Sequence, residues 1–343
     1  MEDKAVALSL KAELLCHGLL HVPDDIRIPF PTSKSSSGPG AGSESVVVCF
    51  SGKRVKVPIS KHEGDLELRQ IGEGDYEILK DGKVLIKNVG LIPTLCHAPG
   101  QAFVSLGRSC IMKCAFCTIN EAGTKEDVTV DSAVEMIIAA SKKKGFKAVA
   151  VTSGVPRTVE DQIDKLASVI AAVRKELPKT PIGVEPLALK RSDIAKLKKA
   201  GATEVKVNLE AATREIFEKV CPNRDCQTTI KAIGWAVEEF GKGAVTSNII
   251  IGLGETDEEV RNALEMLADI GSVANIRAVR INDINRERLQ IALGDLRPLD
   301  KERVIKLARM QKEILAKRGL STKTFKTMCF PCSCCDLVPE IDF

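Results

Sequence analysis

Short apolar runs rich in β-branched residues alternate with longer amphipathic stretches over most of the chain after residue 100. In the amphipathic stretches apolar residues recur every three or four positions, as in helices that cover a sheet. The predicted strands are Gln101–Leu106, Ala148–Ser153, Ile182–Glu185, Glu204–Leu209, Val245–Gly252 and Ile276–Ile281. The predicted helices are Ser132–Lys144, Val159–Leu177, Arg191–Ala200, Thr228–Phe240, Asp257–Ile270 and Lys301–Lys317. Six such units predict a parallel sheet that closes as a partial (β/α)6 TIM-like barrel rather than a complete eightfold one.

The residues before this barrel show another pattern. A helical stretch, Lys4–Leu20, and a connector rich in Pro, Ser and Gly, Pro29–Gly42, precede several short apolar runs. These runs predict strands at Val46–Phe50, Arg54–Pro58, Asp75–Leu79 and Lys83–Val89, with Asp81-Gly82 as a hairpin turn. The fold class is therefore α/β. We expect a small β-rich N-terminal domain (residues 1–98), the barrel (99–319) and a Cys-rich C-terminal tail (320–343).

Composition narrows the possible functions. Of 343 residues, 44% are hydrophobic and 28% charged, which excludes a disordered chain. A net charge of +4 and 3% aromatic residues argue against a nucleic-acid or anionic-membrane partner. Met1–Leu20 has no uninterrupted apolar run of an export signal, and no stretch has the length of a membrane span, so we expect a cytoplasmic protein. In that reducing compartment the twelve cysteines are expected to serve as metal ligands or nucleophiles.

Three cysteines follow the first predicted barrel strand at the spacing C-x3-C-x2-C: Cys110, Cys114 and Cys117. The loop after a strand of a parallel barrel is where barrel enzymes carry their chemistry. Three thiolates on one loop leave one iron of a four-iron cluster, or one position of a tetrahedral metal, free for another ligand. The alternatives are a zinc site with a distant fourth ligand and three unrelated buried thiols.

Four more cysteines lie in the tail, Cys329, Cys332, Cys334 and Cys335. They predict a second, auxiliary iron–sulfur cluster. Because adjacent Cys334 and Cys335 cannot easily reach one cluster, three of the four are expected to ligate, and Ser333 or Asp336 is a candidate non-Cys ligand. A structural zinc knot, a redox dithiol and a flexible tail that passes persulfide remain open alternatives. Cys221 and Cys226 are weaker ligand candidates.

The C-x3-C-x2-C loop opening a partial barrel resembles the radical S-adenosylmethionine (SAM) superfamily, over about Gln101–Arg318. The resemblance implies that the three cysteines hold a [4Fe-4S] cluster and that SAM chelates its fourth iron. It also implies cofactor contacts from residues after successive strands: Phe116, Ser153, Gly154, Glu185, Asn208, Glu210, Arg224, Asn248, Ile250, Gly252 and Glu255. Two positions depart from the family pattern, since Thr152-Ser153-Gly154 lacks the usual acid and Asn248 replaces a glycine. Taken singly, each of these residues also fits an ordinary strand end or helix start.

The resemblance implies radical chemistry. A reduced cluster cleaves SAM to a 5′-deoxyadenosyl radical, which abstracts hydrogen from an unactivated carbon, and a reductant such as ferredoxin or flavodoxin is required. Residues 184–210 and 250–259 are similar to the biotin synthase and lipoyl synthase group, which suggests sulfur insertion from the auxiliary cluster into a small-molecule or carrier-protein-bound acyl chain. Because the extra cysteines lie at the C-terminus, the chain resembles the archaeal two-component lipoyl synthase type, with a second radical SAM subunit as partner, or an uncharacterised relative.

Two alternatives stay open. Gly38–Ile59 resembles a poorly characterised radical SAM group associated with nitrile-forming gene clusters, so modification of an amino-acid-like metabolite or peptide without sulfur insertion is one of them. The other, from a different class, is a non-catalytic iron–sulfur protein that transfers electrons or delivers clusters. The residues that act directly on a substrate are not predicted.

Overall fold

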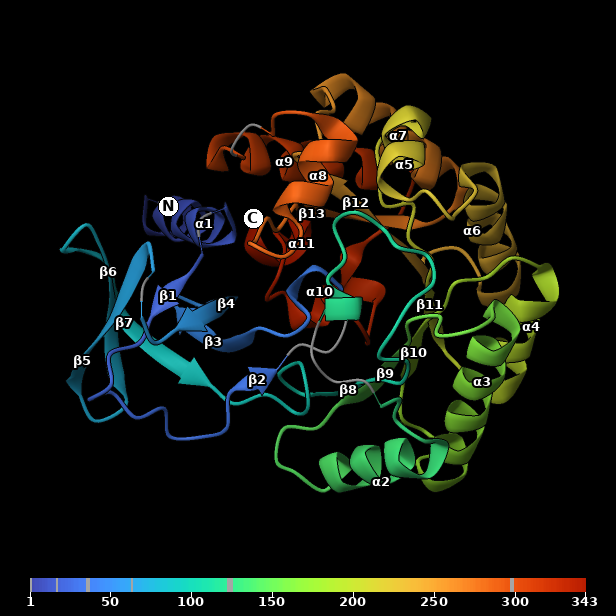
Figure 1. Ribbon diagram of the computed structural model, residues 1–343, viewed down its shortest axis with the longest axis horizontal. Coiled ribbons are helices and arrows are strands. Elements are labelled where there is room, and N and C mark those ends of the chain that lie inside the picture. Colours follow the sequence, from blue (N-terminus) through green and yellow to red (C-terminus); the bar gives the residue numbers. More distant parts are fainter. Residues whose placement is uncertain (1, 17, 35–37, 63, 122–125, 297–298) are drawn as a thin grey trace.

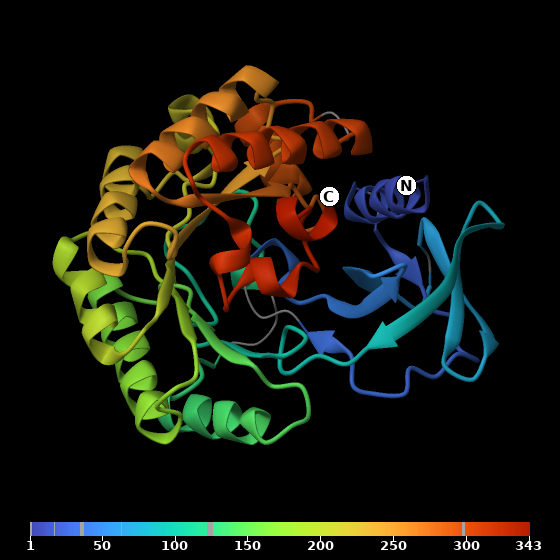
Figure 2. The same cartoon turned by 180° about the vertical axis from the view of Figure 1, so that it is seen from behind.

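The structure is a computed structural model that describes residues 2–16, 18–34, 38–62, 64–121, 126–296 and 299–343. Parts of the predicted Lys4–Leu20 helix and of the Pro29–Gly42 connector lie outside these residues. A six-stranded parallel sheet curves around the centre of the molecule, with helices on its outer side (Figure 1). A smaller unit made of the N-terminal strands lies beside the open edge of this sheet (Figures 1 and 2).

The curved sheet pairs its strands in strict chain order, from β8 to β13. These strands are β8 (Gln101–Ser105), β9 (Ala148–Thr152), β10 (Ile182–Glu185), β11 (Glu204–Lys206), β12 (Val245–Ile251) and β13 (Val273–Ala278). The covering helices are α2 (Val130–Ser141), α3 (Val159–Glu176), α4 (Arg191–Ala200), α5 (Arg214–Val220), α6 (Cys226–Phe240), α7 (Asp257–Ile270), α8 (Arg286–Leu293) and α9 (Lys301–Lys317). Solved relatives of the same architecture, described below, confirm the predicted partial barrel.

Two strands and two helices differ from the prediction. The last strand begins at Val273, three residues before the predicted start, and pairs with β12 through Ala278. Val279 still donates to the carbonyl of Ile251, and the chain then turns towards α8, whose short segment was not predicted. The fourth strand stops at Lys206 instead of continuing to Leu209. Helix α5 was also missed, and its seven residues are too few for a clear helical pattern.

The N-terminal unit is a small closed sheet. Helix α1 (Glu2–Cys16) precedes β1 (Leu20–His21), β2 (Ser33–Lys34), β3 (Glu44–Phe50), β4 (Lys53–Ser60), β5 (Leu66–Gly72), β6 (Asp75–Lys80) and β7 (Lys83–Ile92). Strand β3 pairs with β4 on one side and with β7 on the other, which closes the ring β3-β4-β1-β5-β6-β7. Lys80 pairs with Lys83 across the predicted Asp81-Gly82 turn, and both turn residues have positive φ. Two features differ from the prediction. Strand β5 was not predicted, and the first helix ends at Cys16 instead of Leu20.

The C-terminal tail runs inside the barrel. Its α10 (Cys329–Cys332) lies within the curve of the sheet, and α11 (Pro339–Asp342) lies next to the N-terminal helix (Figure 2). Glu204, the first residue of β11, accepts hydrogen bonds from the amides of Lys326 (2.8 Å) and Thr327 (2.9 Å). Gln101, the first residue of β8, exchanges two hydrogen bonds with the backbone of Met328. These anchors lie at the amino ends of the strands, so the tail enters the barrel from that end.

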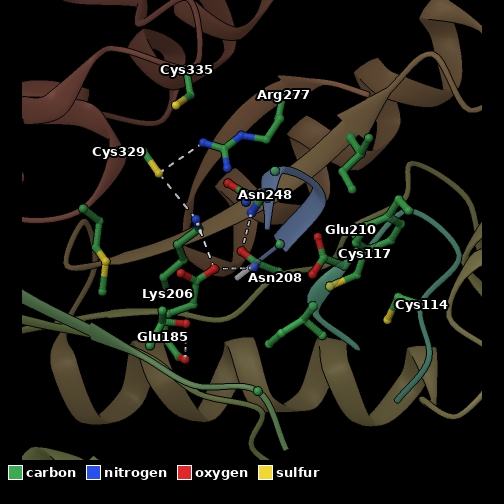
Figure 3. A pocket seen from close by; sticks show the side chains of 18 of the residues that line it. Cys114, Cys117, Glu185, Lys206, Asn208, Glu210, Asn248, Arg277, Cys329 and Cys335 are labelled. Atoms are coloured by element: carbon green, nitrogen blue, oxygen red, sulfur yellow. Dashed lines mark hydrogen bonds and ion pairs between the residues drawn. The ribbon is translucent and has the colours of Figure 1, made fainter. Parts of the chain in front are cut away.

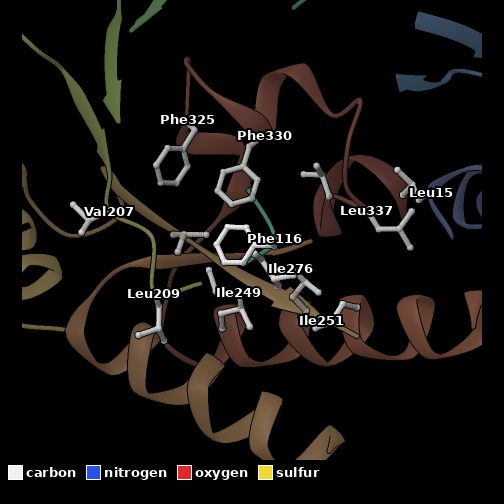
Figure 4. Close-up of a cluster of buried hydrophobic side chains, with 14 of the residues drawn as sticks. Leu15, Phe116, Val207, Leu209, Ile249, Ile251, Ile276, Phe325, Phe330 and Leu337 are labelled. Atoms are coloured by element: carbon white, nitrogen blue, oxygen red, sulfur yellow. The ribbon is translucent and has the colours of Figure 1, made fainter. Parts of the chain in front are cut away.

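Close packing holds the tail where it enters. A Cβ on Gly183 would lie 2.2 Å from the hydroxyl oxygen of Thr327, so only glycine lets the tail pass this strand. Phe325 and Phe330 stack with ring centroids 5.0 Å apart and pack among buried barrel residues such as Ile249 and Ile276 (Figure 4). Residues 320–343 are therefore part of the barrel core and not a flexible appendage. No helix of the described residues is both long and apolar enough to cross a membrane.

Candidate active site

One cavity of about 270 Å³ lies inside the barrel. It is lined by the three cysteines of the C-x3-C-x2-C loop and by all four tail cysteines. Figure 3 shows the two sets at different sides of the pocket, with Lys206, Asn208 and Glu185 between them. Two cysteine clusters that are about 200 residues apart in sequence thus face a common space.

The loop that carries Cys110, Cys114 and Cys117 follows β8, as predicted, and backbone groups hold it. The side chain of Asn120 exchanges two hydrogen bonds with the backbone of Cys110. The amide of Ile111 donates to the carbonyl of Val155, and that of Ala115 donates to the carbonyl of Val220. The loop is therefore held from the β9 side and from the end of α5, which fixes where the three sulfurs open onto the cavity.

Cys221, at the end of α5, is an unexpected neighbour of this loop. Its side chain is fully buried and forms a hydrogen bond with Cys114. This hydrogen bond is the main cause that lowers the pKa of Cys114, against the opposing effect of burial. Burial raises the pKa of Cys117 to about 12 and also raises that of Cys110. Cys226, the other scattered candidate, begins α6 and does not line the cavity.

Polar residues at the end of β10, shortly after β11 and within β12 form a connected network in the middle of the cavity. Asn208 donates to Glu185 (2.7 Å) and accepts from the amide of Asn248 (3.1 Å). Glu210, whose backbone is held at φ 70°, forms a 3.2 Å ion pair with Arg224. Arg224 also donates to the carbonyl of Asn208 (2.8 Å). All five predicted residues therefore line one site and bond to one another, as their positions after consecutive strands suggested.

Burial and charge act in opposite directions on the two acids of this network. Burial alone would raise the pKa of Glu185. The ion pair with Lys206 and the hydrogen bond from Asn208 outweigh burial, so the pKa of Glu185 is lowered. Burial dominates at Glu210 and raises its pKa despite Arg224. Two carboxylates in one cavity thus have pKa values moved in opposite directions, a pattern found at functional sites.

Of the other predicted contacts, Phe116, Ser153, Gly154 and Ile250 line the cavity. Ser153 is engaged locally, since it accepts from the amide of Gly107 (2.9 Å) and donates to the carbonyl of Gly154 (2.7 Å).

Gly252 and Glu255 are not brought to the cavity. Both carboxylate oxygens of Glu255 accept backbone amides, from Gly252 and Leu253 at 2.8 Å each, and the side chain pairs with Arg303 at 3.0 Å. Gly252 has φ 92°, and a Cβ there would lie 2.9 Å from Val279. These residues shape the loop between β12 and α7, and neither lines the cavity.

Two cations contact the first tail cysteine. Lys206, from β11, and Arg277, from β13, each donate to the sulfur of Cys329 at 3.4 Å (Figure 3). Lys206 also pairs with Glu185 (3.2 Å), and Arg277 pairs with Asp336 (2.7 Å). Asp336 is thus occupied by a cation and by Asn275 (2.9 Å), which does not favour it as a metal ligand.

The remaining tail cysteines are not equivalent. Cys334 is fully buried and its thiol donates to the carbonyl of Cys332 at 3.1 Å. A hydrogen bond between the two side chains lowers the pKa of Cys332 to about 7 and raises that of Cys334. Cys329, Cys332 and Cys335 are all less buried than Cys334 and follow one another at three-residue intervals. The arrangement separates one supporting thiol from three that are free to ligate.

The cysteine side chains of both sets, the loop and the tail, are donors that suit iron–sulfur clusters. Each has three cysteines on a short segment that faces one cavity, and the tail set has two cations beside a sulfur that would carry negative charge as a thiolate. Within the described ranges, no three His, Cys, Asp or Glu side chains already converge as a metal site, and this applies equally to both sets.

Several cavity residues were not predicted. Lys56, His97, Lys206, Arg277 and Arg280 all line the pocket. For Lys206 a signal existed, because a lysine in the middle of a buried parallel strand is unusual. Lys56 gave none: it alternates with the core residues Val55 and Val57, a pattern typical of a strand with one face in solvent.

A parallel barrel with three cysteines on its first loop, and a polar network after the following strands, defines a cofactor-dependent barrel enzyme. The family model of the radical SAM superfamily matches residues 104–267, which include this loop and the network. Residues 104–267, just under half of the chain, thus match a radical SAM domain, which supports a radical SAM enzyme. A non-catalytic electron carrier or cluster-delivery protein is thereby set aside, and a [4Fe-4S] cluster with SAM and the need for a reductant follow from the family.

The curated relatives are lipoyl synthases. That of Pyrobaculum aerophilum is 29% identical over 218 residues, which cover 58% of this chain and 73% of that protein. That of Mycobacterium tuberculosis is 28% identical over 240 residues, or 64% of this chain and 72% of the relative. The chain spans under two thirds, 64%, of the lipoyl synthase of Chlamydia muridarum, with 27% identity. The predicted similarity to the lipoyl synthase group is confirmed.

Solved structures agree on the fold. The hydrogenase maturase HydG from Carboxydothermus hydrogenoformans superposes with a TM-score of 0.53 at 17% identity, over 64% of this chain and 52% of HydG. Methylornithine synthase (PylB) gives a TM-score of 0.52 at 17% identity, over 62% of each chain. At these identities the likeness concerns the barrel alone.

Proposed function

We propose that the protein inserts sulfur into an aliphatic carbon of an acyl substrate, with the tail cysteines as ligands of an auxiliary cluster. The observation that carries the proposal is the single cavity that both cysteine sets line. A substrate held there lies between a radical source and a second sulfur-rich centre, as C–S bond formation requires. The similarity to lipoyl synthases supports the same reaction class.

Cys110, Cys114 and Cys117 would hold the [4Fe-4S] cluster, which together with bound SAM would supply radical chemistry for the removal of a hydrogen atom from the substrate. The chain's own residues position the partners of this step. The network of Glu185, Asn208 and Asn248 offers two carbonyl acceptors and a carboxylate for the hydroxyl groups of a ribose. Phe116 and Ile250 present apolar surface that excludes water from the reacting centre.

In the tail, we assign ligation to Cys329, Cys332 and Cys335, and a supporting role to Cys334. Lys206 and Arg277 stabilise negative charge on the sulfur of Cys329 and so hold it on the cavity side. These three cysteines would hold a cluster that would supply the sulfur of the new bond. A ferredoxin or flavodoxin as reductant, and a second radical SAM subunit, remain proposals for partners.

Anaerobic reconstitution of the full chain tests the tail assignment. The wild type should hold about eight iron atoms, and the triple variant Cys329→Ala/Cys332→Ala/Cys335→Ala about four. The matched control is Cys226→Ala, which lies outside the cavity and should leave the count unchanged. About four iron atoms in both the wild type and the triple variant would remove the auxiliary cluster.

Sulfur insertion needs a separate measurement. Reconstituted protein, dithionite and SAM are incubated with an octanoylated carrier protein, an octanoylated peptide or free octanoate, and the products are analysed by mass spectrometry. A mass gain of sulfur that the triple variant does not produce supports the proposal. Formation of 5′-deoxyadenosine without any gain of sulfur on the three substrates contradicts it.

A further inference from the structure

Four cations line the cavity on the side of the tail: Lys56, Lys206, Arg277 and Arg280. Two of them have carboxylate partners, Lys206 with Glu185 and Arg277 with Asp336. Over the part of the chain that the structure describes, Lys56 and Arg280 have no carboxylate oxygen within 4 Å. The cavity therefore carries two positive charges that its own carboxylates do not compensate.

Lys56 is the more informative of the two, because it is 4% exposed. Its ammonium group donates to three neutral acceptors: the hydroxyl of Ser33 (2.8 Å), the Nδ1 of His97 (3.0 Å) and the carbonyl of His97 (3.0 Å). Burial, then the nearby positive charges, keep the pKa of His97 well below its usual value, so the ring is neutral. Burial lowers the pKa of Lys56, while the nearby thiols of Cys335 and Cys332 act to raise it, so a bound anion would stabilise the charged form of this lysine.

Arg280 is held next to Lys56. Its guanidinium donates to the carbonyl of Lys56 at 3.1 Å, which ties the segment after β13 to strand β4 of the N-terminal unit. The two cations therefore reach the cavity from different parts of the chain and meet in one corner. A planar carboxylate can accept from a guanidinium and an ammonium at the same time.

The walls next to this corner are mainly apolar. Ala98, Phe103 and Met328 line the cavity there, and Phe103 packs against the ring of His97 with centroids 5.2 Å apart. Residues 38–45 of the N-terminal unit also contribute to the lining. The corner thus combines positive charge with apolar surface and suits a small molecule with an anionic end and an aliphatic body.

We propose that Lys56 and Arg280 bind the carboxylate of a small aliphatic carboxylic acid, which is the substrate of the radical reaction. This inference rests on the proposed function and names its substrate class. An acyl chain attached to a carrier protein by an amide has no charge at that end and would offer the two cations no carboxylate. On this view the N-terminal unit is a substrate-binding element, because strand β4 supplies Lys56.

Binding by the anaerobically reconstituted full chain tests the proposal. Isothermal titration calorimetry compares straight-chain carboxylates, from butanoate to octanoate, with the amides of the same chain length. We expect at least one carboxylate to bind the wild type about tenfold or more tightly than its amide, since hydrogen bonds to charged groups are lost with the amide. Lys56→Met and Arg280→Met should each remove this preference, whereas the exposed Lys83→Met, the matched control, should keep it.

Iron counts on the same samples separate this site from the tail cluster. Lys56→Met should retain the iron content of the wild type. Equal affinity for carboxylate and amide in the wild type, or no binding of any carboxylate, overturns the proposal. Loss of iron in Lys56→Met with carboxylate affinity unchanged also overturns it, because the cation would then serve the cluster. Carboxylate binding that depends on Lys56, without sulfur insertion, leaves this site standing and refutes only the proposed reaction.

Discussion

The C-x3-C-x2-C loop and the cysteine tail face the same cavity but are held there in different ways. Backbone hydrogen bonds to Val155 and Val220, both close to it in the barrel, hold the loop. Side chains from distant parts of the sequence hold the tail. Glu204 and Gln101 form hydrogen bonds with it where it enters the barrel, and buried Lys11 of α1 pairs with Asp342 at 2.9 Å. The loop therefore belongs to the barrel, while the tail depends on the whole tertiary structure.

Charge separates the two regions as well. Beside the loop, one buried arginine, Arg224, is shared between Glu210, with which it forms an ion pair, and Cys114, whose pKa it helps to lower. Beside the tail, Lys206 and Arg277 donate to Cys329 directly. Reduction potentials of iron–sulfur clusters respond to nearby charge and to hydrogen bonds on the sulfurs. The comparison suggests two centres with different electronic roles in one cavity.

The largest effect is expected at the loop. Cys114→Ala should lower 5′-deoxyadenosine formation more than about 100-fold, because even an outer hydrogen-bond partner of a metal ligand is typically worth about 10–100-fold. Chromatographic quantification of 5′-deoxyadenosine after reaction with dithionite and SAM measures it. Cys226→Ala is the control and should retain wild-type rates. Normal 5′-deoxyadenosine formation by Cys114→Ala would show that this loop does not hold the radical-generating cluster.

A smaller effect, on stability, is expected where the tail enters the barrel. Glu204→Ala leaves the amides of Lys326 and Thr327 without their buried acceptor, which should cost about 3 kcal/mol of unfolding free energy. It should also expose the tail to limited proteolysis. Urea denaturation and mass spectrometry of the digests measure both, with the exposed Glu73→Ala as control. A tail that remains resistant in Glu204→Ala would place the main anchor elsewhere, at Gln101 or Lys11.

The smallest effect is expected for the buried tail thiol. Cys334→Ala removes a hydrogen bond to Cys332 and a small buried side chain, which should cost about 1–2 kcal/mol of stability. The iron content should remain at the wild-type value. Iron determination and thermal unfolding on the same preparation check the two statements. Loss of about four iron atoms would make Cys334 a ligand and reverse the assignment within the tail.

Local patterns explain which parts of this structure were accessible to prediction. The alternation of strands and helices gave the barrel, and strand-end positions gave the network of Glu185, Asn208, Glu210 and Asn248. Where the pattern was weak, prediction failed, as for α5 and for the shift of β13 to Val273. For Glu255 the sequence could not show that its carboxylate accepts hydrogen bonds from its own loop, because a Gly-Leu-Gly-Glu segment reads the same whether the acid binds a ligand or the loop.

The amino-acid sequence by itself determined the fold class and the cluster loop, because both depend on the spacing of residues that are close together in the sequence. Three cysteines within eight residues reach a common point whatever the rest of the chain does. Only the tertiary structure decided that the tail enters the barrel and that Lys56 faces the cavity. Both depend on contacts between residues more than 100 positions apart, such as Glu204 with Thr327 and Lys56 with Arg280. Strand alternation places Lys56 on the face opposite the N-terminal core, but only the packed barrel makes that face an interior one.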